Sequence, residues 1–115
     1  MKSFAQMLNL RDDPAAIERY KAYHRDVWPE VLTALNERGI TRMKIYVKGR
    51  KMFMFCEADD TFDPALDFPR FIEEPAFARW EDVMHTLQES TPEAPGEFWT
   101  LMEEVFDLET ARTGA

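Results

Sequence analysis

Tyr20 and His24 are the residues in this sequence whose types and spacing most directly indicate chemistry. At a separation of four, a phenol and an imidazole are neighbours on one helix face, where they can hold a hydroxylated ligand and transfer a proton. His24 also continues a row with helical spacing that is otherwise uncharged: Ile17, Tyr20, Val27 and Val31. An imidazole in such a row either bonds to a buried partner or faces a ligand, and the spacing leaves both interpretations open.

Other candidates are weaker than this pair. His85 lies beside the apolar stripe of a later helix, so we expect it at the surface in a structural role. Trp80 belongs to that stripe and either fills the core or packs against the nonpolar face of a ligand. For Trp28 and Trp99 we expect core or interface packing. No sequence-local pair of ligands indicates a metal site, and no glycine-rich phosphate loop or nucleophile motif is present.

Charge and composition exclude several classes of partner. The net charge of −8, with Lys and Arg scattered singly or in pairs, argues against nucleic acid. No apolar run approaches the roughly 20 residues of a membrane helix, and the N-terminus lacks a secretion signal, so we expect no membrane partner. The single Cys56 cannot form an internal disulfide, which is typical of a cytoplasmic protein.

A small α+β domain must position these residues. We expect strands over residues 3–10, 40–48, 51–58 and 98–108, and loops over 59–68 and 90–96. One helix should start at Pro14 behind an Asp13 cap, break at Pro29 and stop at Gly39. After one or two turns over 68–74, a second helix should run to about residue 88. The order βαββαβ predicts one ferredoxin-like domain over residues 1–115, a four-stranded antiparallel sheet with helices on one face.

The third expected strand is apolar on both faces. Met52, Met54 and Cys56 alternate with Phe53 and Phe55. Because two helices cover only one face of a sheet, we expect the other face to meet a second copy of the chain, giving a homodimer.

The chain resembles the L-rhamnose mutarotase family along most of its length. The motifs that carry the resemblance are Tyr20-x3-His24-x3-Trp28-Pro29-Glu30, Ile45-Tyr46, Arg79-Trp80, Gly96-Glu97 and Glu104-Val105-Phe106. The resemblance implies a dimeric α/β barrel that interconverts the α and β anomers of a 6-deoxy-L-sugar without metal or cofactor. It also implies that His24 is the general acid, that Tyr20 binds a sugar hydroxyl, and that Trp80 lines the nonpolar side of the sugar.

Two departures from the family pattern bear on the substrate. Glu81 stands where the family usually has a second tryptophan, and Met43 stands where it usually has a tyrosine. These departures should change which hydroxyl pattern is accepted, but they leave the acid in place. The resemblance makes L-rhamnose the favoured sugar, and the departures make L-fucose a close second. The second proton-transferring group stays open among Tyr20, a water molecule, Glu81 and Glu104. Two alternatives remain: a non-catalytic dimeric α+β barrel that binds a small ligand, and a cofactor-free, monooxygenase-like enzyme.

Overall fold

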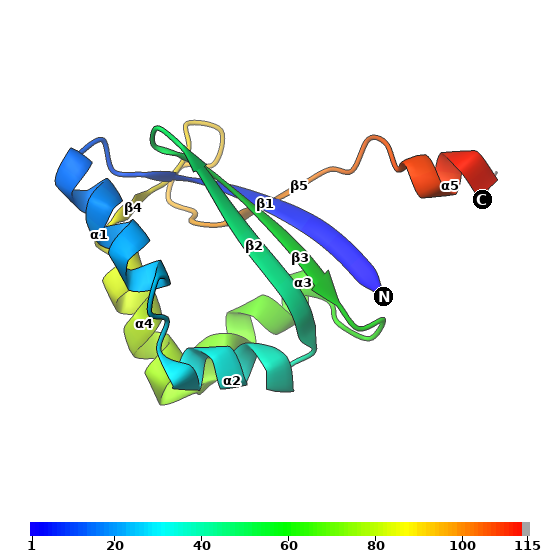
Figure 1. Cartoon of the computed structure of the whole chain (residues 1–115), viewed down its shortest axis with the longest axis horizontal. Helices are drawn as coiled ribbons and strands as arrows, with labels where there is room; N and C mark the ends of the chain where they lie inside the picture. The colour runs from blue at the N-terminus through cyan, green and yellow to red at the C-terminus, as the bar shows by residue number, and fades with distance from the viewer. Residues whose placement is uncertain (114–115) are drawn as a thin grey trace.

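The computed structural model, which describes residues 1–113, contains a curled antiparallel sheet with its main helices gathered on one side (Figure 1). Two short strands share the fourth position of this sheet, because both pair with β1. The order β2-β3-β1, followed by β4 and β5, is the ferredoxin-like arrangement that the sequence predicts. The strands are β1 (Lys2–Leu10), β2 (Ile40–Lys48), β3 (Lys51–Ala58), β4 (Gln88–Glu89) and β5 (Thr100–Met102).

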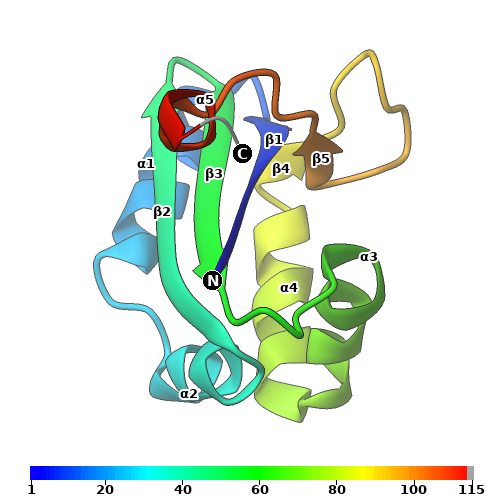
Figure 2. The same ribbon diagram turned by 90° about the vertical axis from the view of Figure 1, so that its right-hand side faces the viewer.

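Six helical segments within residues 1–113 connect or follow these strands. In Figure 2, β2, β3 and β1 lie side by side, with α4 and α3 to one side of them and α2 below. None of the helices within residues 1–113 is long and apolar enough to cross a bilayer. The helical segments are α1 (Pro14–His24), α2 (Pro29–Glu37), α3 (Pro64–Asp67), the 3₁₀ helix η1 (Phe68–Glu73), α4 (Pro75–His85) and α5 (Leu108–Thr113).

Local signals set the limits of α1 and α2. Asp13 caps α1 through a hydrogen bond that its side chain accepts from the backbone N–H of Ala15, 3.0 Å away. Trp28 has extended angles (φ −58°, ψ 132°), because the proline after it disfavours the helical region. Helix α1 nevertheless ends at His24, before the break that we expected at Pro29. The row of residues from Ile17 to Val31 is therefore divided between two helices and does not form one continuous stripe.

Gly39 ends the second of these helices, as predicted. Its φ of +98° lies in the left-handed region, where residues with a Cβ are strained. A Cβ at this position would also collide with the carboxylate of Asp59. The positive φ therefore requires glycine at the point where the chain turns from α2 into β2, and any other residue there would also displace the Asp59 side chain.

Two expectations about regular structure are wrong. Residues 64–67 form α3, although we expected a loop over 59–68; Asp63 and Pro64 start this helix as Asp13 and Pro14 start α1. The expected strand over 98–108 is reduced to β5, which pairs only with residues 5–7 of β1. Beyond β5 the chain leaves the sheet and ends in α5, away from the body of the molecule (Figure 1).

The main core lies between the inner face of the sheet and the helices. Leu8, Leu10 and Met52 point inward from the strands and pack with Trp80 and Met84 of α4. The alternation along β3 is confirmed, because Met52, Met54 and Cys56 are buried whereas Phe53 is 37% exposed. The inner face thus forms the wall of a site, whereas the outer face combines partly exposed aromatic side chains with exposed charged ones such as Lys44 and Lys48.

Candidate active site

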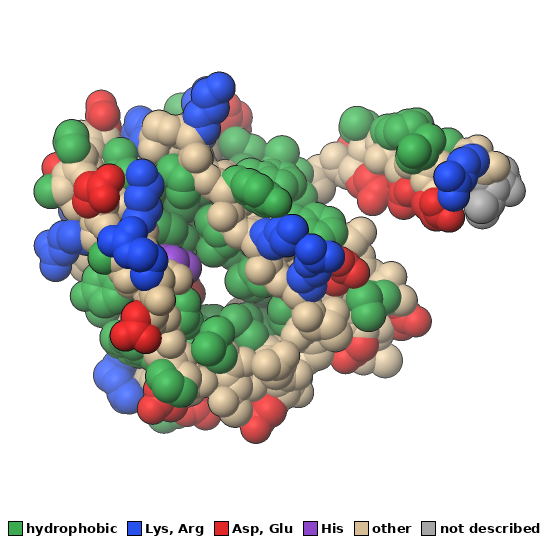
Figure 3. Space-filling view, in the orientation of Figure 1, with side chains coloured by type: hydrophobic (Ala, Val, Ile, Leu, Met, Phe, Trp, Pro, Cys, Tyr) green, Lys and Arg blue, Asp and Glu red, His purple; other side chains and the backbone are tan. Residues whose placement is uncertain are grey.

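A cleft of about 1370 Å³ opens between the inner face of the sheet and α1, α2 and α4. Figure 3 shows this hollow in the molecular surface, bordered mainly by hydrophobic side chains. The volume exceeds the roughly 300–1,000 Å³ typical of ligand pockets, so a monosaccharide has ample room. All three residues that the sequence predicts as the site, namely Tyr20, His24 and Trp80, line this one cleft.

His24 is held by its own helix. Its Nδ1 lies 2.8 Å from the carbonyl oxygen of Tyr20. Because a carbonyl can only accept, Nδ1 carries the proton, and Nε2 is the nitrogen available for other chemistry. No residue within 1–113 forms a hydrogen bond with Nε2. The ring is half-buried and borders the cleft, so it is satisfied at one nitrogen without being sealed into the core.

Aromatic contacts fix the orientation of the His24 ring. It stacks on Tyr20, with ring centroids 4.2 Å apart, and meets the edge of Trp80 at 5.4 Å. Trp80 is 5% exposed and also makes edge contacts with Tyr23 and Trp28. Burial lowers the pKa of His24 from its ordinary value of 6.5, which favours the neutral imidazole.

Tyr20 is almost completely buried beneath His24. Burial raises the pKa of its phenol far above the ordinary value of 10, with a smaller opposing effect from a hydrogen bond to the Gln88 side chain. A phenol in these surroundings stays protonated at neutral pH. It can donate or accept a hydrogen bond, but it cannot supply a phenolate base.

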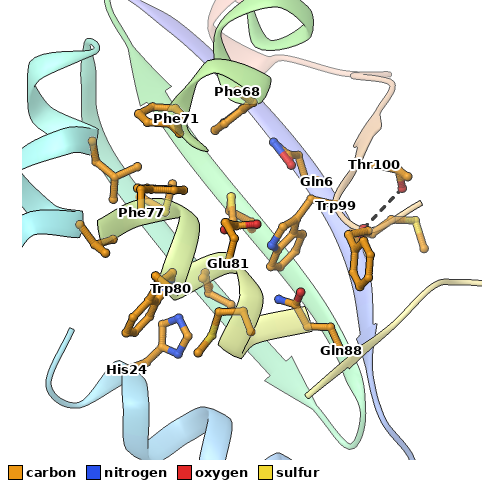
Figure 4. A pocket seen from close by; sticks show the side chains of 18 of the residues that line it. Gln6, His24, Phe68, Phe71, Phe77, Trp80, Glu81, Gln88, Trp99 and Thr100 are labelled. Carbon is orange, nitrogen blue, oxygen red and sulfur yellow. Dashed lines mark hydrogen bonds between the residues drawn. The ribbon is translucent and has the colours of Figure 1, made fainter. Parts of the chain in front are cut away.

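Polar side chains that the sequence analysis did not select also line the cleft. Gln6 is 5% exposed and Gln88 is 6% exposed, and both lie among apolar residues. Figure 4 shows them on the same side of the pocket as Trp99, with His24 and Trp80 across from them. The sequence does indicate Gln6. It alternates with Leu8 and Leu10 on the inward face of β1, where a strand of this pattern is expected to carry an apolar side chain.

The two departures from the family pattern, Met43 and Glu81, both border the cleft. Glu81 extends from α4 beside Trp80, and its carboxylate oxygen Oε2 lies 3.3 Å from Nε2 of His85. His85 itself stacks on Phe98, with ring centroids 3.8 Å apart, and its side chain is 38% exposed. His85 is thus at the surface, as expected, but it is also paired with a residue of the cleft.

Comparison with known proteins identifies the family. The family model for L-rhamnose mutarotase matches residues 3–108. The chain belongs to the L-rhamnose mutarotase family. It is therefore an isomerase of the sugar mutarotase class, and Met43 and Glu81 are changes within the cleft of a member of this family.

Three relatives of the chain cover from 79% to 96% of its length. A UPF0734 protein of Dictyostelium discoideum is 42% identical over 113 residues, covering 94% of this chain and 90% of that protein. The L-fucose mutarotase of Xanthomonas campestris is 34% identical over 114 residues, covering 96% and 91%. The L-rhamnose mutarotase of Paraburkholderia phymatum is 25% identical over 93 residues, covering 79% of each chain.

Solved structures support the fold. The L-rhamnose mutarotase of Formosa agariphila matches with a TM-score of 0.69 at 22% identity, covering 94% of this chain and 99% of that one. The tetracenomycin F2 cyclase of Streptomyces glaucescens matches with a TM-score of 0.56 at 18% identity, covering 90% and 97%. At these identities the likeness concerns the fold alone, which hosts different chemistries.

Proposed function

We propose that this protein interconverts the α and β anomers of a 6-deoxy-L-sugar by opening and closing the sugar ring, with His24 as a catalytic acid–base residue. One observation carries the proposal: the ring of His24 is anchored through Nδ1 and leaves Nε2 unbonded at the edge of a cleft. Mutarotation needs proton transfer at two oxygens and no cofactor, which suits an imidazole, whose ordinary pKa of 6.5 lies near neutrality and is lowered here by burial.

The walls of the cleft suit a deoxysugar. Trp80 offers an apolar ring to the nonpolar face and methyl group of the sugar, whereas Gln6 and Gln88 offer amides to its hydroxyl groups. Tyr20 would hold a hydroxyl through its protonated phenol. This division of apolar and polar side chains supports roles for Tyr20 and Trp80 in substrate binding.

L-fucose is our preferred substrate in light of the relatives, ahead of L-rhamnose, which the sequence alone favours. The L-fucose mutarotase of Xanthomonas campestris is 34% identical over 114 residues, whereas the L-rhamnose mutarotase of Paraburkholderia phymatum is 25% identical over 93. Replacement of family aromatics by Met43 and Glu81 also changes the cleft wall, where hydroxyl patterns are distinguished.

Exchange NMR between the anomers of free sugars tests this function. We expect faster exchange for L-fucose than for L-rhamnose at equal protein concentration, and no acceleration for a sugar that lacks a free anomeric hydroxyl, such as a methyl glycoside. Absence of acceleration with every free deoxysugar would refute the mutarotase proposal and favour a ligand-binding module.

We also propose that the active form is a homodimer assembled on the outer face of the sheet. Three outward side chains remain substantially exposed there: Tyr46 at 55%, Phe53 at 37% and Met102 at 43%. The segment after β5 adds Val105 at 87% and Phe106 at 69%, which contact little of their own chain. Exposed apolar surface of this extent on one side of a small domain is typical of an interface.

A further inference from the structure

Glu81 is a carboxylate on the wall of an otherwise largely apolar cleft. It follows Trp80 on α4 and borders the same cleft as His24. Its side chain is only 29% exposed, although charged side chains of this type are rarely withdrawn from water unless they are paired. Figure 4 shows the Glu81 carboxylate between Trp80 and Trp99, toward the middle of the pocket.

Neighbouring groups hold one oxygen of this carboxylate and leave the other unbonded. Nε2 of His85 lies 3.3 Å from Oε2, and the stacking of His85 on Phe98 keeps that partner in place. Within residues 1–113, no group forms a hydrogen bond with Oε1. Two further ionisable groups act on or respond to the Glu81 charge: Asp82 beside it on α4, and Tyr20 on α1.

The other carboxylates are less suited to chemistry inside the cleft. Glu93 and Glu97 border it, but both are exposed on the loop after β4. Glu104 is exposed on the segment beyond β5 and does not line the cleft. Among the described carboxylates that line the cleft, Glu81 alone is withdrawn from solvent.

We propose that Glu81 is the second proton-transferring residue of the site and works with His24 on opposite sides of the anomeric centre. The proposal rests on the proposed mutarotase function. It turns one of the groups that the sequence leaves open into a specific assignment, and it gives a role to a residue that stands where the family usually has a tryptophan.

The step balances without a further reactant. The O1–H bond of the sugar breaks and its proton passes to Oε1 of Glu81, while the electron pair of that bond forms the C1=O1 double bond. The C1–O5 bond breaks, and its electron pair stays on O5, which takes the proton from Nε2 of His24. The step therefore starts from the Glu81 carboxylate and the imidazolium form of His24, in which both ring nitrogens carry a proton. After rotation about C1–C2, closure on the other face of the aldehyde returns the O5 proton to His24 and the Glu81 proton to O1. Both residues regain their starting states.

The environment of the two residues supports this exchange. Burial lowers the pKa of His24 from 6.5 and raises that of Glu81 from 4.5, with His85 opposing the rise and Asp82 adding to it. The two pKa values thus approach one another. Similar pKa values keep both protonation states of the pair accessible, as a reaction that runs in both directions requires.

Anomer exchange by Glu81→Gln, with Glu74→Gln as the matched control, tests the assignment. Glu74 is exposed at the start of α4 and does not line the cleft, so its variant makes the same chemical change outside the site. We expect Glu81→Gln to lower kcat by about 10²–10³-fold with little change in KM, and Glu74→Gln to stay within about twofold of wild type. The fall in wild-type activity at acidic pH, where a carboxylate becomes protonated, should be absent from the residual activity of Glu81→Gln.

The results of this experiment distinguish the role of Glu81 from the mutarotase function. A kcat for Glu81→Gln within about threefold of wild type, or a loss confined to KM, would overturn the role of Glu81 while leaving the mutarotase function intact. No acceleration by the wild-type protein would overturn both. If Glu81→Gln does not fold, Glu81→Asp replaces it: a lowered kcat with a shifted acidic limb supports the assignment, and an unchanged pH profile overturns it.

Discussion

Replacing His24 with asparagine separates the structural role of this side chain from the proposed catalytic one. In the structure, Nδ1 of His24 lies 2.8 Å from the carbonyl oxygen of Tyr20. The amide nitrogen of asparagine can occupy a position close to that of Nδ1 and donate to the same carbonyl oxygen. The variant has no group in place of Nε2. It therefore keeps the helix-terminal hydrogen bond and removes the atom that would exchange protons with the sugar.

The contacts of the His24 ring determine how much stability His24→Asn should lose. The variant loses ring contacts with Tyr20 at 4.2 Å and with Trp80 at 5.4 Å. Aromatic contacts contribute about 0.5–1.5 kcal/mol each, so we expect the free energy of unfolding to fall by about 1–3 kcal/mol. A domain with a typical stability of about 5–15 kcal/mol remains folded after such a loss.

The catalytic loss should be larger. General acid–base catalysis typically contributes about 10²–10⁴-fold, equivalent to about 3–5 kcal/mol of barrier. We therefore expect exchange NMR to show anomer exchange slowed by that factor for L-fucose and L-rhamnose, in a variant whose circular dichroism matches wild type. A folded His24→Asn protein that exchanges anomers within about threefold of wild type would refute the reasoning.

Three further predictions concern the Tyr20 hydroxyl, the pKa of His24 and the outer face of the sheet. Tyr20→Phe removes the hydroxyl that bonds to the buried Gln88, so denaturant unfolding should show a loss of about 1–3 kcal/mol; an unchanged free energy of unfolding would exclude that bond. Because the pKa of His24 is lowered on folding, the unfolded state binds more protons below about pH 6.5. Wild type should therefore lose stability relative to His24→Asn as pH falls through that range, by at most about 1.4 kcal/mol per pH unit, whereas a constant difference would contradict the burial of the ring. Phe53→Lys, on the outer face of β3, should convert the proposed dimer into monomers in sedimentation experiments, whereas Lys51→Ala at the exposed end of that strand should not.

Much of the fold could be predicted because its boundaries are set by local chemistry. Asp13 before Pro14, Trp28 before Pro29, and Gly39 at a positive φ act within a few residues of themselves, and all three do what the sequence predicts. Asp63 before Pro64 carries the same helix-starting signal as the first pair, and the short α3 could have been found from it.

The end of the sheet could not be predicted in this way. Residues 98–108 are apolar and β-prone, but a strand needs a partner, and pairing with β1 stops at Ala5. The composition of the segment does not reveal where the chain leaves that partner. The exposure of Val105 and Phe106 follows from that departure. The start of α5, in contrast, is a local signal, because the Asp107 side chain accepts hydrogen bonds from the backbone N–H groups of Glu109 and Thr110.

The candidate site was predicted where polar residues interrupt an apolar pattern. His24 attracted attention because it occupies an apolar position, and it does lie at the cleft with Tyr20 and Trp80. Gln6 carries the same signal on a strand. Gln88 could not be found from periodicity, because it follows the end of α4 in a two-residue strand, where no repeat is long enough to define a face.

The divided fourth strand allows the mouth of the cleft to change independently of the scaffold. The chain leaves the edge of β1 at β4 and rejoins that edge at β5, and the excursion between them borders the cleft. Insertions or deletions there would alter which sugars are admitted while leaving the pairing of β1 with β3 in register. Substrate preference could thus change through mutations in the segment between β4 and β5 alone, with little effect on the stability of the sheet.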